Sequence, residues 1–249
     1  MPAYNEGHAI EETIDRVNRA ARQAGLEYEL IVVDDGSVDE TRRKAVGKLI
    51  TIVTQANNNS HVKIIGYGKN MGKGHAVKTG FAYATGDAVI FVDSDLDVDP
   101  EQVTRYVKAL DYGDVVIGSK WHPQSSVQIP LIRKLLSHGF NVLVRLLTGL
   151  RLRDTQTGIK AIRRSALEGV FSRLAVKRYA FDVELLMMAK LCGLKIVELP
   201  VNLRMRSSFD LKEVWRIFVD LLGIAYRLRV LKYYQCPVVS KATRIGLKD

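Results

Sequence analysis

The sequence is poor in the residues that cross-link small domains or bind zinc. Its 249 residues include two cysteines, Cys192 and Cys236, and five histidines. Two cysteines cannot build a disulfide framework, and the histidines show no paired ligand spacing, so neither a disulfide scaffold nor a zinc site is expected. We interpret both cysteines as core or incidental thiols.

Long apolar runs are missing as well. The best segment, residues 214–226, is interrupted by Arg216 and Asp220, whereas a membrane-spanning helix needs about 20 mainly apolar residues. The chain does not begin with a basic, apolar and small-residue leader. We therefore expect no spanning helix and a reducing, cytoplasmic compartment.

The composition excludes a disordered tail or a fibre, because 47% of the residues are hydrophobic and 26% are charged. The net charge of +10 is unevenly spread: residues 1–125 hold 14 basic and 18 acidic residues, and residues 126–249 hold 23 and 9. An acidic front half suits recognition of a metal or a base by carboxylates. A basic rear half suits phosphate, anionic lipid or nucleic acid.

Short apolar runs alternate with helical patterns along the front half. Runs that predict buried strands lie at residues 29–33, 61–66, 87–92 and 115–118. Residues 10–24 and 73–84 place apolar side chains at helical spacing. The alternation predicts an α/β fold with an open, mostly parallel sheet flanked by helices and no firm domain boundary. Residues 1–6 read as a loop where a first strand would be expected, so that strand is missing or cut short.

Two segments of the rear half are basic and amphipathic. Residues 131–147 and 211–234 combine broad apolar faces and aromatic side chains with interspersed arginine and lysine. Such helices can lie in a membrane interface. They can equally pack an apolar face on the core and expose a basic face to water. The pattern alone leaves both readings open.

The strongest chemical signal is Asp93-Ser94-Asp95, which directly follows an apolar strand. Two carboxylates at a strand end can converge on a hard divalent cation, and Mg²⁺ or Mn²⁺ is the expected ion. The alternative is a solvated acidic turn that continues through Asp97 and Asp99.

Two further turns suit a nucleotide. Residues 34–37 are Asp-Asp-Gly-Ser after a strand, where a carboxylate can accept a ring N–H of uracil or guanine. Residues 69–74 supply glycines that allow close approach to a phosphate, with Lys73 as a point charge. Walker and Rossmann glycine spacings are absent. A competing reading is that Asp39 and Thr41 only cap a helix.

These motifs occur together in an order that resembles known families. The set that resembles inverting glycosyltransferases of the GT-A fold is Pro2-Ala3-Tyr4-Asn5-Glu6, Val32-Val33-Asp34-Asp35-Gly36-Ser37, Asn70-x-Gly72-Lys73-Gly74, Ala84-x-Gly86-Asp87 and Asp93-Ser94-Asp95. The set that resembles dolichyl-phosphate (polyprenyl-phosphate) glucosyl- and mannosyltransferases is Gly118-Ser119-Lys120, Arg133-x-x-x-Ser137, Asp154-Thr155-Gln156-Thr157-Gly158-x-Lys160 and Phe181-Asp182-Val183-Glu184-Leu185. The resemblance extends from about residue 2 to about residue 205.

The resemblance implies roles for the donor residues. The residues implied to bind the nucleotide sugar are Pro2, Ala3, Tyr4, Glu6, Asp35, Lys73, Asp93, Ser94, Asp154, Gln156, Asp182 and Arg206, with Asp35 reading the base. Asp93 and Asp95 would hold the metal. Asp154, Gln156 and Asp182 would face the sugar, and Arg206 would reach the diphosphate. Without the resemblance, Asp182 and Glu184 read as an acidic pair at a helix N-terminus.

It also implies an acceptor site formed by Lys120, Arg133 and Ser137, which would hold a lipid phosphate. Arg133 and Ser137 are four residues apart and so share one face of a helix. Lys120 stands where the family commonly has arginine, a departure that loses a bidentate contact.

Together these features predict a single GT-A domain over residues 1–249. Residues 1–125 would bind the nucleotide sugar, and residues 126–249 would bind the acceptor and face the membrane. The expected reaction moves a hexose, glucose first, from UDP-glucose to dolichyl or polyprenyl phosphate with inversion, at the cytoplasmic membrane face. GDP-mannose and a soluble polysaccharide or protein acceptor are the alternatives within the fold. A nucleic-acid module would leave Asp93 and Asp95 unexplained, so no nucleic-acid partner is expected; a non-catalytic lipid scaffold is the remaining option.

Overall fold

The computed structural model describes residues 1–55, 61–205 and 211–234. A parallel three-stranded sheet has the order β1 (Pro2–Ala3), β2 (Glu29–Asp34) and β3 (His61–Gly66). The expected first strand is therefore present, although it is only two residues long. Pro2 lies opposite Val33, which anchors the segment beside the central strand.

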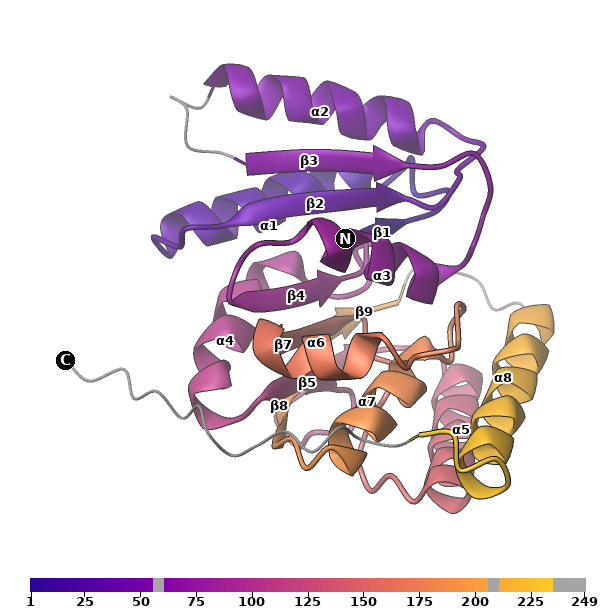
Figure 1. Ribbon diagram of the computed structural model, residues 1–249. Coiled ribbons are helices and arrows are strands. Elements are labelled where there is room, and N and C mark those ends of the chain that lie inside the picture. Colours follow the sequence, from indigo (N-terminus) through magenta and orange to yellow (C-terminus); the bar gives the residue numbers. More distant parts are fainter. Residues whose placement is uncertain (56–60, 206–210, 235–249) are drawn as a thin grey trace.

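The second sheet has the order β4 (Ala88–Val92), β7 (Ile159–Arg163), β5 (Val115–Ser119) and β8 (Ile196–Pro200). β7 runs antiparallel to both of its neighbours, whereas β5 and β8 are parallel. The prediction of a mostly parallel sheet thus missed one reversed strand. Figure 1 shows the two sheets following one another in one layer, with β3 at one end and β8 at the other. The short strands β6 (Ser126–Gln128) and β9 (Asn202–Arg204) form a separate parallel pair.

Helices flank this layer on both sides (Figure 1). They are α1 (Ile10–Gln23), α2 (Thr41–Gln55), α3 (Lys73–Tyr83), α4 (Val103–Lys108), α5 (Leu131–Thr148), α6 (Arg164–Phe171), α7 (Phe181–Leu191) and α8 (Leu211–Arg229), with 3₁₀ turns η1 (Pro100–Gln102) and η2 (Ala109–Tyr112). α1 forms where predicted because Ile10, Ile14 and Val17 recur at helical spacing and are buried. Two glutamates in its first turn favour the positive end of the helix dipole.

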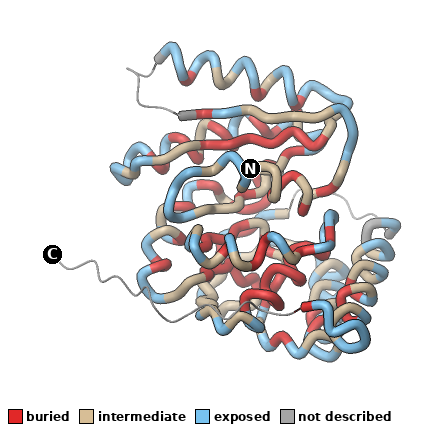
Figure 2. Tube along the Cα trace, viewed as in Figure 1, coloured by how far each residue is buried: buried red, intermediate tan, exposed pale blue. Residues whose placement is uncertain are grey.

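The core is continuous with the functional end of the sheet. α7 is apolar on nearly every side, and each of its residues from Phe181 to Ala189 is buried (Figure 2). Because a helix that is apolar all round must be surrounded, α7 packs against the β5–β7 sheet, α6 and α3. Its first turn brings the buried carboxylates Asp182 and Glu184 into this apolar setting. Such groups need partners: Glu184 accepts a hydrogen bond from the Val176 N–H, and the partners of Asp182 belong to the site described below.

α5 and α8 pack against one another at the edge of the molecule (Figure 1). The large apolar side chains that they expose are called the α5–α8 surface here: Leu131, Ile132, Leu135, Leu136, Val142, Leu143, Leu146, Trp215, Val219, Leu222 and Tyr226. Leu131 is 84% exposed and Trp215 is 65% exposed. The helices also pack on the core, through Val144 of α5 and through Leu221 and Ile224 of α8, so each of the two readings of these segments is met in part. No helix in the described ranges has the length and hydropathy of a membrane-spanning segment.

One interpretation of the cysteines is also wrong. Cys192, which follows α7, is disulfide-bonded and not an incidental thiol. The sequence offered only two cysteines, too few to indicate a framework, so spacing gave no sign of this bond. Cys236 lies outside the described residues.

Candidate active site

Polar side chains gather where β1, β2 and β4 end. Ala3 is buried, and its carbonyl accepts a hydrogen bond from the Asp35 N–H at 2.8 Å. The Ser94 hydroxyl donates to the Pro2 carbonyl at 2.9 Å, which ties the end of β4 to β1. Tyr4 is exposed beside this junction. The turns that the sequence singled out therefore lie at one edge of the sheet, where open α/β folds bind ligands.

Asp35 organises the glycine-rich loop that follows β3. Its buried carboxylate accepts hydrogen bonds from the Tyr67 hydroxyl at 2.7 Å and from the Met71 and Gly72 N–H groups at 2.8 Å each. Gly36 has a φ of 70°, and a Cβ there would lie 2.5 Å from the backbone of Lys69. Only glycine lets the two loops approach this closely. Tyr67 was missed by sequence reasoning, since its contact joins residues far apart in the chain.

Asp39 also has the capping role that was offered as its alternative. Its carboxylate accepts from the backbone N–H of Thr41, the first residue of α2, and from that of Gly7, each at 3.0 Å. Burial alone would raise its pKa, but the Thr41 and Gly7 hydrogen bonds hold the pKa of Asp39 below its usual range.

A chain of alternating charges lies at the centre of the site. Lys73, the first residue of α3, places its Nζ 2.8 Å from Asp93 Oδ2 and 3.2 Å from Asp182 Oδ2. The other oxygen of Asp182 is 2.9 Å from Lys160 Nζ, which also donates to the Thr157 carbonyl at 2.8 Å. β4, β7, α3 and α7 thus each contribute one charged group.

Burial and charge oppose each other in this chain. Burial alone would raise the pKa of Asp182, but Lys160 and Lys73 hold it below its usual range. Burial likewise disfavours the charged form of Lys73, yet Asp182 and Asp93 raise its pKa above the ordinary value. For Lys160 burial prevails, and its pKa is lowered. Lys160 belongs to the 154–160 motif, but the sequence predicts no role for it. A lysine between the apolar residues of a strand could have indicated a buried charged site.

Gly158 lets β7 approach the first of the paired aspartates. Its carbonyl accepts from the Asp93 N–H at 2.9 Å, and a Cβ at Gly158 would lie 2.4 Å from Asp93 Oδ2. A side chain there would displace the carboxylate. The glycine of the 154–160 motif is therefore required by the position of Asp93.

Four acids at this edge lie close enough for their charges to interact, and we call them the acid cluster: Glu6, Asp93, Asp95 and Asp97. Burial and the charges of Asp93 and Asp97 raise the pKa of Asp95 to about 7. Burial and the nearby aspartates, Asp95 foremost, raise the pKa of Glu6 to about 7. Leu96, beside Asp95, has a φ of 61°, which is rare for a leucine and marks a strained turn.

The acid cluster fits a hard divalent cation in its chemistry. Its donors are carboxylate oxygens, and burial, together with the negative charge of neighbouring aspartates, raises the pKa values of Glu6 and Asp95. Over the described residues, no group of three or more histidine, cysteine or acidic side chains is arranged as a complete ligand set.

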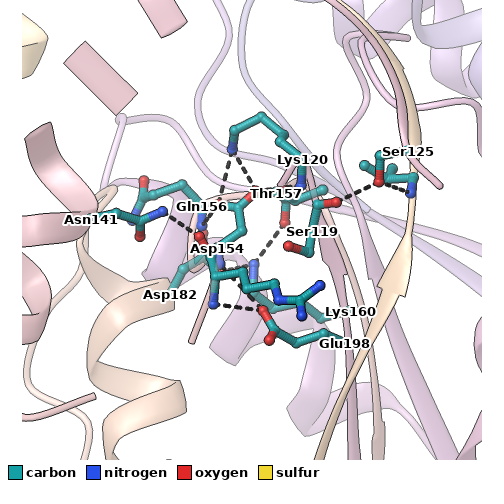
Figure 3. A network of polar contacts seen from close by, with 12 residues as sticks. Ser119, Lys120, Ser125, Asn141, Asp154, Gln156, Thr157, Lys160, Asp182 and Glu198 are labelled. Atoms are coloured by element: carbon teal, nitrogen blue, oxygen red, sulfur yellow. Dashed lines mark hydrogen bonds and ion pairs between the residues drawn. The ribbon is translucent and has the colours of Figure 1, made fainter. Parts of the chain in front are cut away.

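Lys120 is engaged by Asp154 in a buried ion pair (Figure 3). Lys120 Nζ lies 2.7 Å from Asp154 Oδ2, and the Lys120 N–H donates to the same oxygen at 2.9 Å. Asp154 also accepts from the Thr157 hydroxyl and from the Gln156 N–H. Burial alone would raise the pKa of Asp154, but Lys120 holds it below its usual range.

Gln156 and the α5 residues complete the predicted set. Gln156 Nε2 is buried and has no hydrogen-bond acceptor within the part of the chain that the structure describes. Arg133 and Ser137 are half-buried in the first two turns of α5, one helical turn apart as predicted. Arg206 lies outside the described residues.

Comparison with known proteins gives consistent matches. The model of the family described as Glycosyl transferase family 2 matches residues 1–171. The human dolichyl-phosphate beta-glucosyltransferase is 34% identical over 248 residues, covering 93% of this chain and 74% of the human protein. A dolichol-phosphate mannosyltransferase from Pyrococcus furiosus is 32% identical over 92% of this chain and 62% of its own length.

Among solved structures, glucosyl-3-phosphoglycerate synthase from Mycobacterium tuberculosis in complex with UDP is similar, with a TM-score of 0.66 and 24% identity. The similarity covers 90% of this chain and 78% of that one. At this identity the likeness speaks for the fold. The α/β GT-A fold and the resemblance drawn from the motifs are confirmed.

Proposed function

This chain belongs to glycosyl transferase family 2, and from that premise we propose that it transfers a hexose from a nucleotide sugar to dolichyl or another polyprenyl phosphate, with inversion. Glucose from UDP-glucose is the first choice, because similar relatives from human and Dictyostelium discoideum are named dolichyl-phosphate beta-glucosyltransferases. GDP-mannose is the alternative donor, supported by the similar mannosyltransferase.

The observation that carries the proposal is the charge chain beside the acid cluster. A nucleoside diphosphate brings negative charge to the edge of the sheet, and Lys73 lies there at the N-terminus of α3. Asp93 and Asp95 would hold a divalent cation, Mg²⁺ or Mn²⁺, which supplies charge neutralisation to the leaving nucleoside diphosphate. Pro2, Ala3, Tyr4 and Glu6 would line the base and ribose, with Asp35 nearby.

The acceptor needs orientation more than activation. A phosphate monoester is already an anion at neutral pH, so its oxygen can attack the anomeric carbon without a strong base. Arg133 and Ser137 would hold that phosphate from one face of α5, and Lys120 would contribute positive charge from beneath. Holding two anions in line is the main task of these residues, because the reactants repel each other in water.

The sugar would lie between the residues that bind the diphosphate and the residues that bind the acceptor phosphate. The amide N–H₂ of Gln156 has no acceptor among the described residues. It could therefore donate a hydrogen bond to a hydroxyl of the sugar. Asp154 and Asp182 each keep a carboxylate in the same region. Because Asp154, Gln156 and Asp182 belong to the rear half, the donor would be held by both halves, with its nucleotide on the front half and its sugar on the rear half.

The α5–α8 surface suits an acceptor with a long apolar chain. Arg133 is flanked along α5 by the exposed Ile132 and Leu135. A cation beside exposed apolar side chains matches an amphiphile whose phosphate is polar and whose tail is not. We propose that this surface lies on the cytoplasmic face of a membrane and that the protein is peripherally bound there.

A transfer assay tests this proposal. Radiolabelled UDP-glucose and GDP-mannose are supplied separately with dolichyl phosphate, with and without Mg²⁺ or Mn²⁺, to the wild type and to Asp95→Asn. We expect organic-extractable product from one donor, dependent on the metal and lost in the variant. A folded wild type that binds a donor yet labels only a soluble saccharide acceptor would refute the lipid acceptor.

A further inference from the structure

Lys73 would repel a divalent cation bound at Asp93, because its ammonium already forms an ion pair with that carboxylate. Its ammonium lies 2.8 Å from Asp93 Oδ2 and its side chain is 17% exposed. The same ammonium is 3.2 Å from Asp182, whose second oxygen is held by Lys160 at 2.9 Å. Asp93, a proposed metal ligand, is thus already paired with the ammonium of Lys73. Asp182 contacts the same ammonium.

Charge is balanced around Lys73 but not around the rest of the acid cluster. Lys73 and Lys160 face Asp93 and Asp182, so these four groups compensate one another. Asp95, in contrast, is acted on more strongly by the charges of Asp93 and Asp97 than by that of Lys73. A divalent ion bound by Asp93 and Asp95 would relieve one side of the cluster while being repelled by Lys73 on the other.

A diphosphate changes that balance. Its oxygens attract both a metal ion and the ammonium of Lys73, and a lysine side chain has the reach and flexibility to move from one anion to another. The glycine-rich loop allows the phosphates to approach, since Gly72 has a φ of 98° directly before Lys73. Transfer of Lys73 from Asp93 to a phosphate would free a carboxylate oxygen.

We propose that Lys73 makes binding of the divalent cation conditional on the donor diphosphate: paired with Asp93, it weakens binding of the metal alone, and by moving to the diphosphate it strengthens binding of metal and donor together. The inference rests on the proposed nucleotide-sugar donor and deepens it. By linkage, the metal must tighten nucleotide binding by the same factor as the nucleotide tightens metal binding.

Mn²⁺ binding measured by electron paramagnetic resonance tests this without reference to activity. The wild type, Lys73→Met, Lys73→Arg and Lys69→Met are titrated with Mn²⁺ alone and with saturating UDP or GDP. We expect Lys73→Met to bind Mn²⁺ alone about tenfold more tightly than the wild type and to lose a similar factor of the nucleotide effect. Lys73→Arg keeps the charge and should stay near the wild type.

Lys69→Met is the matched control, because Lys69 is exposed in the same loop; it should leave both affinities unchanged. If Lys73→Met melts early, Lys73→Gln, which keeps a hydrogen-bond donor beside Asp93, carries the same prediction. The inference is overturned if the wild type binds Mn²⁺ and nucleotide independently, or if a folded Lys73 variant binds Mn²⁺ alone no more tightly. A wild type that binds neither Mn²⁺ nor either nucleotide would overturn the proposed function as well.

Discussion

The acid cluster and the α5–α8 surface depart from ordinary protein structure in opposite ways. The acid cluster gathers carboxylates until the pKa values of Asp95 and Glu6 rise to about 7. The α5–α8 surface leaves large apolar side chains such as Leu131 and Trp215 in water. Folding normally compensates buried charge and buries contiguous apolar surface. Under the proposed function, a cation with a diphosphate would compensate the first departure, and an apolar chain or a bilayer would cover the second.

The ion pairs near the two regions also differ in how many partners their members share. Lys120 and Asp154 form a buried ion pair, so each compensates the charge of the other. Asp93, in contrast, shares Lys73, the first residue of α3, with Asp182. The comparison teaches that burial alone does not separate candidate reactive groups from structural ones, and that the balance of charge around each group has to be considered as well.

The largest effect is expected from a substitution in the acid cluster. Asp95→Asn should reduce hexose transfer by about 100- to 1,000-fold, because one carboxylate that offsets the cation is removed. Binding to vesicles should not change, since the α5–α8 surface is untouched. Transfer rates and vesicle sedimentation are measured on the same preparation. Asp111→Asn, at an exposed acid on η2, is the matched control, and equal losses in both variants would contradict the assignment.

The next prediction concerns the buried ion pair between Lys120 and Asp154. Lys120→Met leaves the buried Asp154 without its cation and should lower the free energy of unfolding by about 3–5 kcal/mol. Urea unfolding of the metal-free protein measures this. Lys134→Met, at an exposed lysine on α5, serves as the control. An unchanged stability would mean that Lys120 is held for the acceptor alone.

A smaller effect is expected at the α5–α8 surface. Leu135→Glu, at a side chain that is 72% exposed, should weaken binding to vesicles containing anionic lipid by about tenfold, because a charge replaces an apolar contact. UDP binding should be retained. Val53→Glu alters an exposed apolar residue on α2, far from this surface in the fold, and should have no effect. Equal weakening by both substitutions would contradict a specific membrane face.

The smallest effect is a dependence of stability on acid. The pKa of Asp154 is lower in the folded chain than its unfolded value of about 3.9. Its contribution is therefore present above about pH 4 and is lost as the pH falls through the depressed folded value. Melting temperatures between pH 7 and pH 3 should fall less steeply for Asp154→Asn than for the wild type. Parallel slopes would show that the ion pair adds no stability.

Much of the fold could be predicted because its elements carry regular apolar patterns. α1, β2, β3 and α3 lie within a residue or so of the predicted ranges. β7 escaped prediction because Lys160 interrupts its apolar run, and its reversed direction depends on pairing with β4 and β5. Direction of this kind is set by tertiary contacts and leaves no local signature.

The candidate site divides in the same way. The Asp-Asp-Gly-Ser and Asp-Ser-Asp turns were located because a strand that ends in acids is visible in the sequence. The partners of those acids were not, since Lys73 meets Asp182 across more than 100 positions of the chain. Gly158 shows the limit most clearly: its need for glycine arises from contact with Asp93, which only the folded chain reveals.

The central claim is that the two regions bind separate substrates of one reaction, and steady-state kinetics of Arg133→Ala test it most directly. KM values for dolichyl phosphate and for the nucleotide sugar are measured in parallel. We predict that the KM for dolichyl phosphate rises about tenfold while the KM for the donor changes less than about twofold. An unchanged KM for dolichyl phosphate, or an equal rise in both values, would contradict the account.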